Sequence, residues 1–185
     1  MKSEKLIFLD RDGIINKSAG KHKYILDWNS FEFLPGFINT FRKICKLNYK
    51  LIIVTNQQCI GKGLINESEL NAIHKNMVNT LNMNQIYIQN IYYCPHLLEE
   101  KCNCRKPNVG MLIKAKKELG LKIDYNYCFV IGDSLSDIST GIAFGCKTIL
   151  LNSTLRKIPR RTQPDFIITE ISQLLNIIIK LEQQK

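Results

Sequence analysis

Short, nearly continuous apolar runs recur along the chain, and segments with helical spacing lie between them. Apolar runs of this length are typical of parallel strands that are covered on both faces. The predicted strands cover Leu6 to Leu9, Leu51 to Val54, Cys128 to Ile131, Thr148 to Leu151 and Phe166 to Ile168.

The apolar positions of the intervening segments repeat every three or four residues, as on one face of a helix. Asn66 and Glu69 have the spacing of a capping box, and Gly120 is a typical helix stop. The predicted helices run from residue 37 to 45, from Asn66 onward, from Met111 to Leu119 and from Ile171 to Leu181.

Strands that alternate with helices predict an α/β fold, a doubly wound, Rossmann-like parallel sheet with helices on both faces. We expect a single domain over residues 1–185, since this length suits one core. Ligands of such folds gather at the carboxyl ends of the strands. Three of these ends carry polar clusters, namely Asp10-Arg11-Asp12, Thr55-Asn56-Gln57 and Gly132-Asp133-Ser134, which predicts one shared site.

Composition narrows the class of protein. Hydrophobic residues make up 45% and charged residues 23% of the chain, which indicates neither disorder nor a membrane protein. No apolar run has the length of a transmembrane helix, and the start of the chain does not resemble a signal peptide, so we expect a cytoplasmic location. The net charge of +10 favours anionic ligands. The lysines are scattered and aromatic residues do not interleave with them, so no nucleic-acid or membrane partner is expected.

The paired acids after the first strand have the chemistry that phosphoryl transfer needs. Asp10 is the candidate nucleophile, and Asp12 is the candidate acid for the leaving oxygen and base for water. Asp133 follows a third strand and is expected to join Asp10 around Mg²⁺, with Asp137 in support at the start of a helix. Thr55 can donate a hydrogen bond to a phosphoryl oxygen, and Lys106 supplies a compact positive charge. The alternative, a strand that ends in a polar turn, explains Asp10 and Asp12 alone.

A second constellation consists of Cys94, His96, Cys102 and Cys104. Three thiolates and one imidazole match a closed, tetrahedral structural zinc site. A redox pair is the alternative, but its expected spacing is Cys-x-x-Cys. Arg105 and Lys106 follow directly, so zinc is expected to brace both cations. We assign no chemistry to the other cysteines, Cys45, Cys59, Cys128 and Cys146.

Taken in order, these motifs resemble those of the haloacid dehalogenase superfamily of phosphatases. The matching positions are Asp10-x-Asp12-Gly13, Thr55, Lys106 and Gly132-Asp133-x-x-x-Asp137. The resemblance implies an aspartyl-phosphate at the first Asp and proton transfer by the second. It also implies Mg²⁺ held by Asp10, Asp133 and the backbone carbonyl of Asp12, in a fold without a large cap domain.

The zinc loop narrows the resemblance to the family of D-glycero-D-manno-heptose 1,7-bisphosphate 7-phosphatases. The supporting stretches are 8–16, 31–36, 55–63, 92–96 and 102–111. This resemblance implies loss of the 7-phosphate on the way to nucleotide-activated heptose, by a protein that we expect to be a monomer acting on a small phosphorylated sugar. The implied substrate contacts are Asp10, Arg11, Asp12, Ser18, Ala19, Gly20, Lys21, Thr55, Asn56, Gln57, Gln58, Arg105 and Lys106.

Two positions depart from this family. Cys59 stands where the loop usually has glycine, which restricts positive φ, and Ser134 stands where a Lys or Arg often contacts phosphate. Histidinol-phosphate phosphatases share the Asp-Arg-Asp-Gly motif and the zinc loop, and remain the nearest alternative. A polynucleotide 3′-phosphatase and a catalytically inactive binding protein are further alternatives. We expect no catalytic role for His22 or for His74, which is interpreted as a surface or boundary residue.

Overall fold

The computed structural model describes residues 3–20, 23–152 and 157–183. Six parallel strands form one sheet in the order β3-β2-β1-β4-β5-β6. Their bounds are β1 Glu4–Leu9, β2 Lys50–Asn56, β3 Ile88–Cys94, β4 Ile123–Gly132, β5 Lys147–Leu151 and β6 Phe166–Ile168. The five predicted strands are therefore present, and β6 has the predicted ends.

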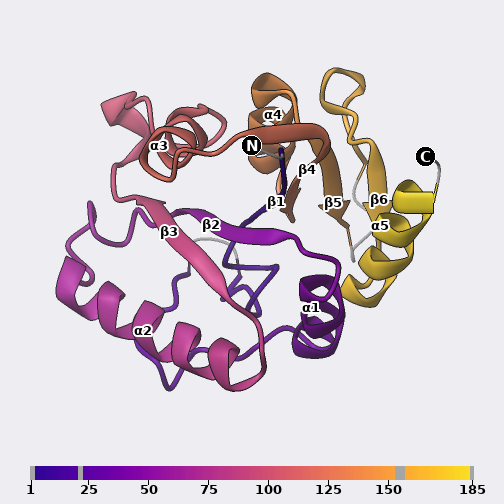
Figure 1. Ribbon diagram of the computed structural model, residues 1–185. Helices are drawn as coiled ribbons and strands as arrows, with labels where there is room; N and C mark the ends of the chain where they lie inside the picture. The colour runs from indigo at the N-terminus through magenta and orange to yellow at the C-terminus, as the bar shows by residue number, and fades with distance from the viewer. Residues whose placement is uncertain (1–2, 21–22, 153–156, 184–185) are drawn as a thin grey trace.

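Helices cover both faces of the sheet, as predicted (Figure 1). The helices are α1 Phe37–Cys45, α2 Glu67–Met83, α3 Gly110–Glu118, α4 Leu135–Phe144 and α5 Leu174–Gln183. In Figure 1, α3 and α4 lie above the sheet, whereas α1 and α2 lie below it, and α5 lies beside α1.

The alternation of side chains along β1 explains why its sequence is apolar throughout. Ile7 and Leu9 belong to the core between the sheet and α1, α2 and α5. Leu6 and Phe8 point to the other face and belong to the core between the sheet and α3. All four side chains are fully buried. Each contributes about 1.5–3 kcal/mol relative to an exposed side chain, so both layers depend on this strand.

Local signals set several helix ends. Asn66 accepts a hydrogen bond from the Glu69 amide at 2.9 Å, and the Glu69 carboxylate accepts one from the Asn66 amide at 2.8 Å, which confirms the predicted capping box. Predicted from Ile171, α5 begins instead at Leu174. Residues Ile171–Gln173 form a 3₁₀ turn, in which the Gln173 side chain accepts hydrogen bonds from the backbone amides just before it.

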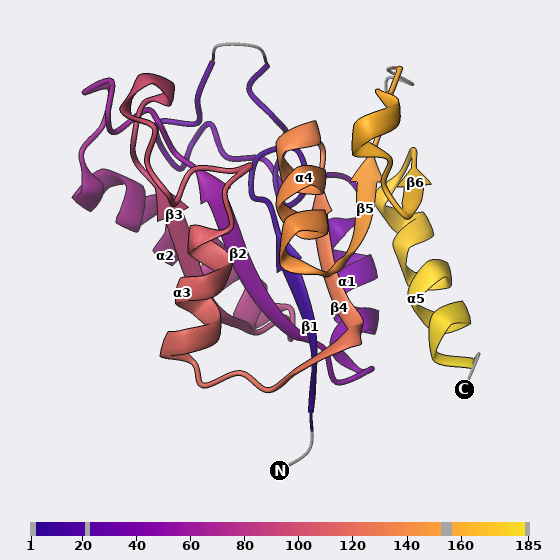
Figure 2. The same ribbon diagram turned by 90° about the horizontal axis from the view of Figure 1, so that it is seen from above.

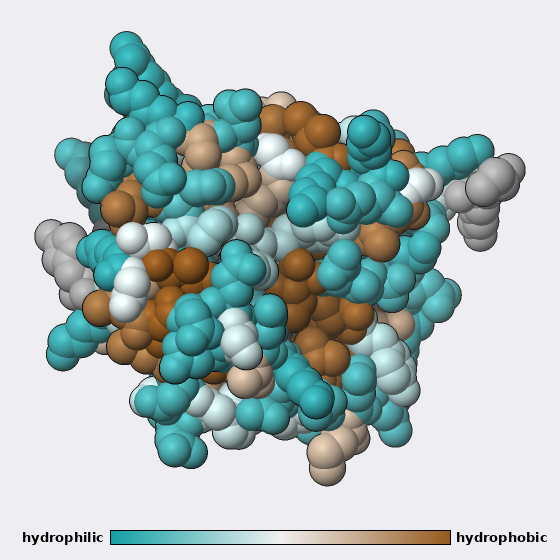
Figure 3. All heavy atoms as spheres, turned by 90° about the vertical axis from the view of Figure 1, so that its left-hand side faces the viewer, coloured by the Kyte–Doolittle hydropathy of each residue, from teal (hydrophilic) through white to brown (hydrophobic). Residues whose placement is uncertain are grey.

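Strand β3 was not predicted, because it lies at the edge of the sheet and has polar residues among its apolar ones. Its exposed side borders a groove of about 410 Å³. Figure 3 shows this side of the molecule, where apolar patches lie among hydrophilic side chains. Within the described residues, no helix is long and apolar enough to cross a membrane.

Three neighbouring strands bring the predicted polar clusters together. Leu9, at the end of β1, pairs with Ile53 of β2 on one side and with Ile131 of β4 on the other. The residues that follow these positions therefore meet at the carboxyl end of the sheet. In Figure 2 the arrowhead of β2 points toward this end, away from the N-terminus. The fold thus builds one polar site from three chain segments.

Candidate active site

Three carboxylates meet at the carboxyl edge of the central strands. Asp10 follows β1, Asp133 follows β4 and Asp137 lies in the first turn of α4, and one oxygen of each lies within 4.8 Å of the others. The Lys106 ammonium lies 2.9 Å from Asp10 Oδ1 and 2.5 Å from Asp137 Oδ1, and donates to the Val54 carbonyl at 2.8 Å. Only 4% of Lys106 is exposed, so water screens these ion pairs weakly.

The electrostatics of this centre follow from burial and crowding. Burial, together with the charges of Asp137 and Asp133, raises the pKa of Asp10 to about 7, against the lowering effect of Lys106. Burial alone would lower the pKa of Lys106, but the carboxylates of Asp10 and Asp137 raise it above its ordinary value. One buried ammonium thus faces three acids, and the surplus of negative charge suits a cation.

The donor set fits a hard divalent cation, which prefers carboxylate oxygens. Gly13 has φ +91°, and a Cβ there would lie 2.2 Å from Asp133 Oδ2. Only glycine therefore allows Asp133 to approach this loop. The cluster contains Asp10 and Asp133 of the predicted magnesium ligands. The side chain of Asp12 lies outside it, and Asp137 lies within it.

The carboxylate of Asp12 is held by three buried or nearly buried donors. Arg11 donates from Nε and Nη2 to Oδ1 at 3.2 and 3.0 Å, and from Nη2 to Oδ2 at 2.9 Å. Asn16 Nδ2 donates to Oδ1 at 2.9 Å, and Gln57 Nε2 donates to Oδ2 at 2.8 Å. Burial raises the pKa of Asp12, but Arg11 and these hydrogen bonds outweigh burial and bring the pKa below its usual value.

Two buried side chains lie behind Asp12. The Arg11 side chain is fully buried and its guanidinium holds Asp12, and the implied substrate contact of this residue stays a prediction. His74 is 5% exposed, not a surface residue, and its Nε2 lies 3.2 Å from Arg11 Nη1. No sequence pattern indicates either contact, because α2 packs on the loop after β1 only in the folded chain.

The loop after β2 connects the site to the cysteine loop. Gln57 Nε2 donates to Thr55 Oγ1 at 2.9 Å, and the Asn56 side chain bonds both backbone polar groups of Lys106 at 3.0 and 3.2 Å. Arg105 donates to Gln58 Oε1 at 3.3 Å and to the His96 carbonyl at 3.2 Å. The predicted substrate contacts at the end of β2, Asn56 and Gln58, therefore lie beside those that follow the cysteine loop, Arg105 and Lys106.

The two departures have structural explanations. Cys59 is fully buried and is not among the residues with positive φ, so the expected backbone restriction does not apply. Its Sγ donates to Gln57 Oε1 at 3.6 Å. Ser134 caps α4 and donates to Asp137 Oδ2 at 2.5 Å, so it orients an acid of the cluster where a Lys or Arg was expected to contact phosphate.

The predicted zinc ligands form a compact cluster. Sulfur and nitrogen atoms of Cys94, His96, Cys102 and Cys104 lie 3.1–3.5 Å apart in the five closest pairs, and all lie within 4.8 Å of one another. The edge of a tetrahedron with Zn–S bonds of about 2.3 Å is about 3.8 Å. The cysteines are free thiols, not disulfides. Donor type and spacing thus fit one tetrahedral metal ion.

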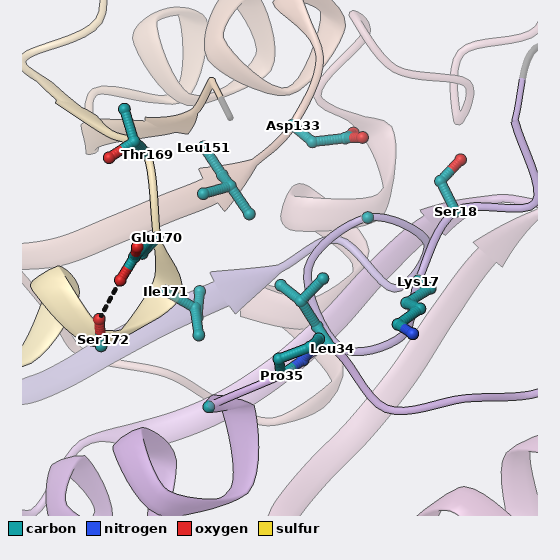
Figure 4. Close-up of a pocket in the computed structure, with 12 residues that line it drawn as sticks. Lys17, Ser18, Leu34, Pro35, Asp133, Leu151, Thr169, Glu170, Ile171 and Ser172 are labelled. Atoms are coloured by element: carbon teal, nitrogen blue, oxygen red, sulfur yellow. Dashed lines mark hydrogen bonds between the residues drawn. The ribbon is translucent and has the colours of Figure 1, made fainter. Parts of the chain in front are cut away.

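A cleft of about 770 Å³ opens beside Asp133 and Gly13 (Figure 4). Lys17 and Ser18 line one side, and the segment Thr169 to Ser172 lines the other. Ser18 is the only predicted contact of its loop that lines this cleft, since Ala19 packs against the core, Gly20 is exposed, and Lys21 lies outside the described residues, as does His22. The second side was not predicted, although Thr169 and Glu170 are polar residues directly after a strand.

The fold and the acidic centre define a phosphatase of the haloacid dehalogenase type. A family model described as polynucleotide kinase 3 phosphatase matches residues 5–182. A D-glycero-beta-D-manno-heptose-1,7-bisphosphate 7-phosphatase from Haemophilus influenzae is 34% identical over 97% of this chain and 99% of its own length. The chain therefore belongs to this phosphatase family and, within it, to the group of heptose-1,7-bisphosphate 7-phosphatases.

Two further relatives support this grouping. A D-glycero-alpha-D-manno-heptose-1,7-bisphosphate 7-phosphatase from Campylobacter jejuni is 40% identical over 83% of this chain and 85% of its own length. The crystal structure of D,D-heptose 1,7-bisphosphate phosphatase from B. bronchiseptica, complexed with magnesium and phosphate, has a TM-score of 0.82 and 25% identity. It covers 95% of this chain and 98% of the other.

Proposed function

We propose that this protein is a Mg²⁺-dependent phosphatase that removes the 7-phosphate of D-glycero-D-manno-heptose 1,7-bisphosphate. The observation that carries the proposal is the cluster of Asp10, Asp133 and Asp137 around Lys106, beside the separately held Asp12. Relatives that are 33–40% identical are named for this reaction, which supports the choice of substrate.

In the first step, an oxygen of Asp10 attacks phosphorus while the bond from phosphorus to the sugar oxygen breaks. Asp12 gives a proton to that leaving oxygen. In the free protein Arg11 favours ionised Asp12, but a phosphate dianion beside this carboxyl favours its protonated form, because like charges raise the pKa of an acid. In the second step Asp12 takes a proton from water, whose oxygen attacks phosphorus and releases phosphate from Asp10.

Other residues bind and orient the phosphoryl group. Thr55 Oγ1 accepts a hydrogen bond from Gln57, so its own proton is available for a phosphoryl oxygen. Lys106 offsets the charge of Asp10 at the point of attack. Asp10, Asp133 and the backbone carbonyl of Asp12 would hold magnesium, as the family resemblance implies. Magnesium supplies positive charge for the transferred group when it is bound.

The cluster of Cys94, His96, Cys102 and Cys104 binds one structural zinc ion in this proposal. Because Arg105 donates to the His96 carbonyl, the metal fixes a cation that faces the loop after β2. We infer that Arg105, Gln58 and the segment from Ser18 to Lys21 contact the remaining sugar and its second phosphate. Monomeric action in the cytoplasm without nucleic acid stays a prediction.

Replacement of the nucleophile tests this proposal. Asp10→Asn keeps the size of the side chain but removes its nucleophilic oxygen pair, so phosphate release from heptose 1,7-bisphosphate is expected to fall more than about a thousandfold. Asp124→Asn, at the opposite end of the sheet in β4, is the matched control and is expected to retain activity. Near-normal turnover by Asp10→Asn would refute the aspartyl-phosphate route.

A further inference from the structure

A buried contact behind Asp12 joins the loop after β1 to α2. Arg11 binds Asp12 with one edge of its guanidinium and lies 3.2 Å from His74 Nε2 with the other. Arginine keeps its proton and has no acceptor, so Nε2 of His74 must accept this hydrogen bond. His74 is therefore neutral, with its proton on Nδ1. Burial and the positive charge of Arg11 both lower its pKa, to about 3, in agreement with that state.

A second buried contact orients another donor to Asp12. The amide of Gln57 donates from Nε2 to Asp12 at 2.8 Å, and its Oε1 accepts from Cys59 Sγ at 3.6 Å. Burial raises the pKa of the Cys59 thiol, so Cys59 keeps its proton and remains a donor. A donor at Oε1 favours the amide orientation that points Nε2 at Asp12. Gln57 is 2% exposed and Cys59 is fully buried, so these groups are closed off from water.

We propose that His74 and Cys59 are positioning residues that hold Asp12 for proton transfer. His74 fixes the guanidinium of Arg11, and Cys59 fixes the amide of Gln57. These two donors, with Asn16, hold both oxygens of Asp12 in one orientation. The inference rests on the proposed function, in which Asp12 protonates the leaving oxygen. Neither His74 nor Cys59 needs to touch the substrate.

The physical consequence is a dependence on the leaving group. A general acid acts only within hydrogen-bond reach of the leaving oxygen, and a displacement of about 1 Å costs about a hundredfold in rate. A sugar alkoxide needs this proton, whereas p-nitrophenolate departs readily without it. A misplaced Asp12 therefore slows the sugar ester far more than p-nitrophenyl phosphate. General damage to the fold slows both equally.

Two substitutions of His74 separate these outcomes. His74→Gln places an acceptor near the position of Nε2, whereas His74→Leu removes it at similar volume. We expect His74→Leu to lower kcat/KM for heptose 1,7-bisphosphate about tenfold or more and for p-nitrophenyl phosphate less than about threefold. His74→Gln is expected to stay within about threefold of wild type on both. The ratio kcat/KM is the informative quantity, because it reports the step in which the leaving oxygen departs.

Ile73→Val is the matched control, since it shortens a core side chain of the same helix and forms no bond to Arg11. Equal losses on both substrates, or a His74→Gln variant as impaired as His74→Leu, would overturn the proposal. If His74→Leu does not fold, the pair Cys59→Ala and Cys59→Ser carries the test. Serine keeps a donor to Gln57, so it is expected to restore the activity on the sugar ester that alanine loses, and equal activity of the two contradicts the proposal.

Failure of the proposed function is recognised separately. If wild type releases no phosphate from heptose 1,7-bisphosphate but hydrolyses p-nitrophenyl phosphate, the choice of sugar is wrong. Glycerol phosphate, another alkyl ester with a poor leaving group, then replaces the sugar. The same difference between the two leaving groups in His74→Leu supports the positioning role, and its absence refutes it.

Discussion

At the scale of single residues, Lys106 is the one buried cation among three acids of the described centre. It pairs with Asp10 and Asp137 and is almost fully buried. Removal of one partner from a buried ion pair leaves the other charge without compensation, which costs far more than the loss of a surface pair. Lys106 therefore stabilises the fold as well as the site.

Lys106→Met tests this stabilisation. Without the ammonium, Asp10 and Asp137 lose their buried counter-charge, so the free energy of unfolding is expected to fall by about 3–5 kcal/mol at pH 7 without added magnesium. Urea unfolding followed by circular dichroism measures the change. Lys114→Met breaks a largely exposed ion pair with Glu118 and is expected to cost less than about 1 kcal/mol. Equal stability of the two variants would contradict the account.

His74 gives a prediction for the pH dependence of stability. Its pKa is about 3 in the folded chain and 6.5 ordinarily, so between these values the unfolded chain binds the extra proton. Its contribution is complete above pH 6.5 and is lost as the pH falls toward 3. The charged groups that act on it are Arg11, which lowers the pKa, and Asp12, which raises it.

The comparison of wild type with His74→Gln isolates this group from other acids that titrate. Below pH 6.5, the stability of wild type relative to the variant is expected to fall by on the order of 1 kcal/mol per pH unit. Chemical unfolding at pH 7.5, 6 and 5 measures the difference. A difference that does not change with pH would show that His74 is not buried as a neutral base.

At the scale of elements, the cysteine loop links the proposed zinc site to the active site. Arg105 follows Cys104 directly and donates to the backbone of His96, so the loop conformation sets where this cation lies. The Asn108 side chain also donates to the Cys102 carbonyl at 2.8 Å. Loss of the metal is therefore expected to act on substrate binding through Arg105.

Cys104→Ala tests the zinc site. Elemental analysis of wild type is expected to find one zinc ion per chain. The variant is expected to lose this ion, with a lower melting temperature and a higher KM for the bisphosphate, since three ligands no longer close the tetrahedron. Cys45→Ala, on α1 and far from the loop, is expected to keep the zinc. Wild type purified without added metal that contains no zinc and folds normally would remove this claim.

Elements differed in how well the sequence predicted them. Strands β1, β2, β4 and β5 are buried on both faces, and their apolar runs predicted them, with ends that differ mostly by one or two residues. Strand β3 has one exposed edge and no such run. Helix α4 was expected only at its start, because its sequence of small and polar residues has a weak apolar stripe.

The site shows the same division. Asp10, Thr55 and Asp133 were predictable, since each lies at the carboxyl end of a buried strand and parallel strands end together. The contact between Arg11 and His74 was not, because it depends on the packing of α2 against a loop 63 residues away in the sequence. Motif spacing predicts which reactive side chains lie at strand ends. The residues that contact these side chains from behind depend on tertiary packing, which motif spacing does not predict.

At the scale of the whole molecule, the acidic centre lies between two features that come from distant parts of the chain. The cysteine loop after β3 lies on one side, and the cleft that ends at residues 169–172 lies on the other. The chain carries a net charge of +10 while its centre is acidic. The overall charge attracts an anionic sugar phosphate. At the acidic centre, bound metal and Lys106 are needed to offset the repulsion between the phosphate and the carboxylates.

The most direct test follows the two phosphates of the substrate by ³¹P NMR. Wild type with Mg²⁺ is incubated with each anomer of D-glycero-D-manno-heptose 1,7-bisphosphate, and Asp10→Asn serves as the inactive control. The resonance of the 7-phosphate is expected to disappear as inorganic phosphate accumulates, while the 1-phosphate remains. Loss of the 1-phosphate, or no phosphate release from either anomer, would contradict this expectation.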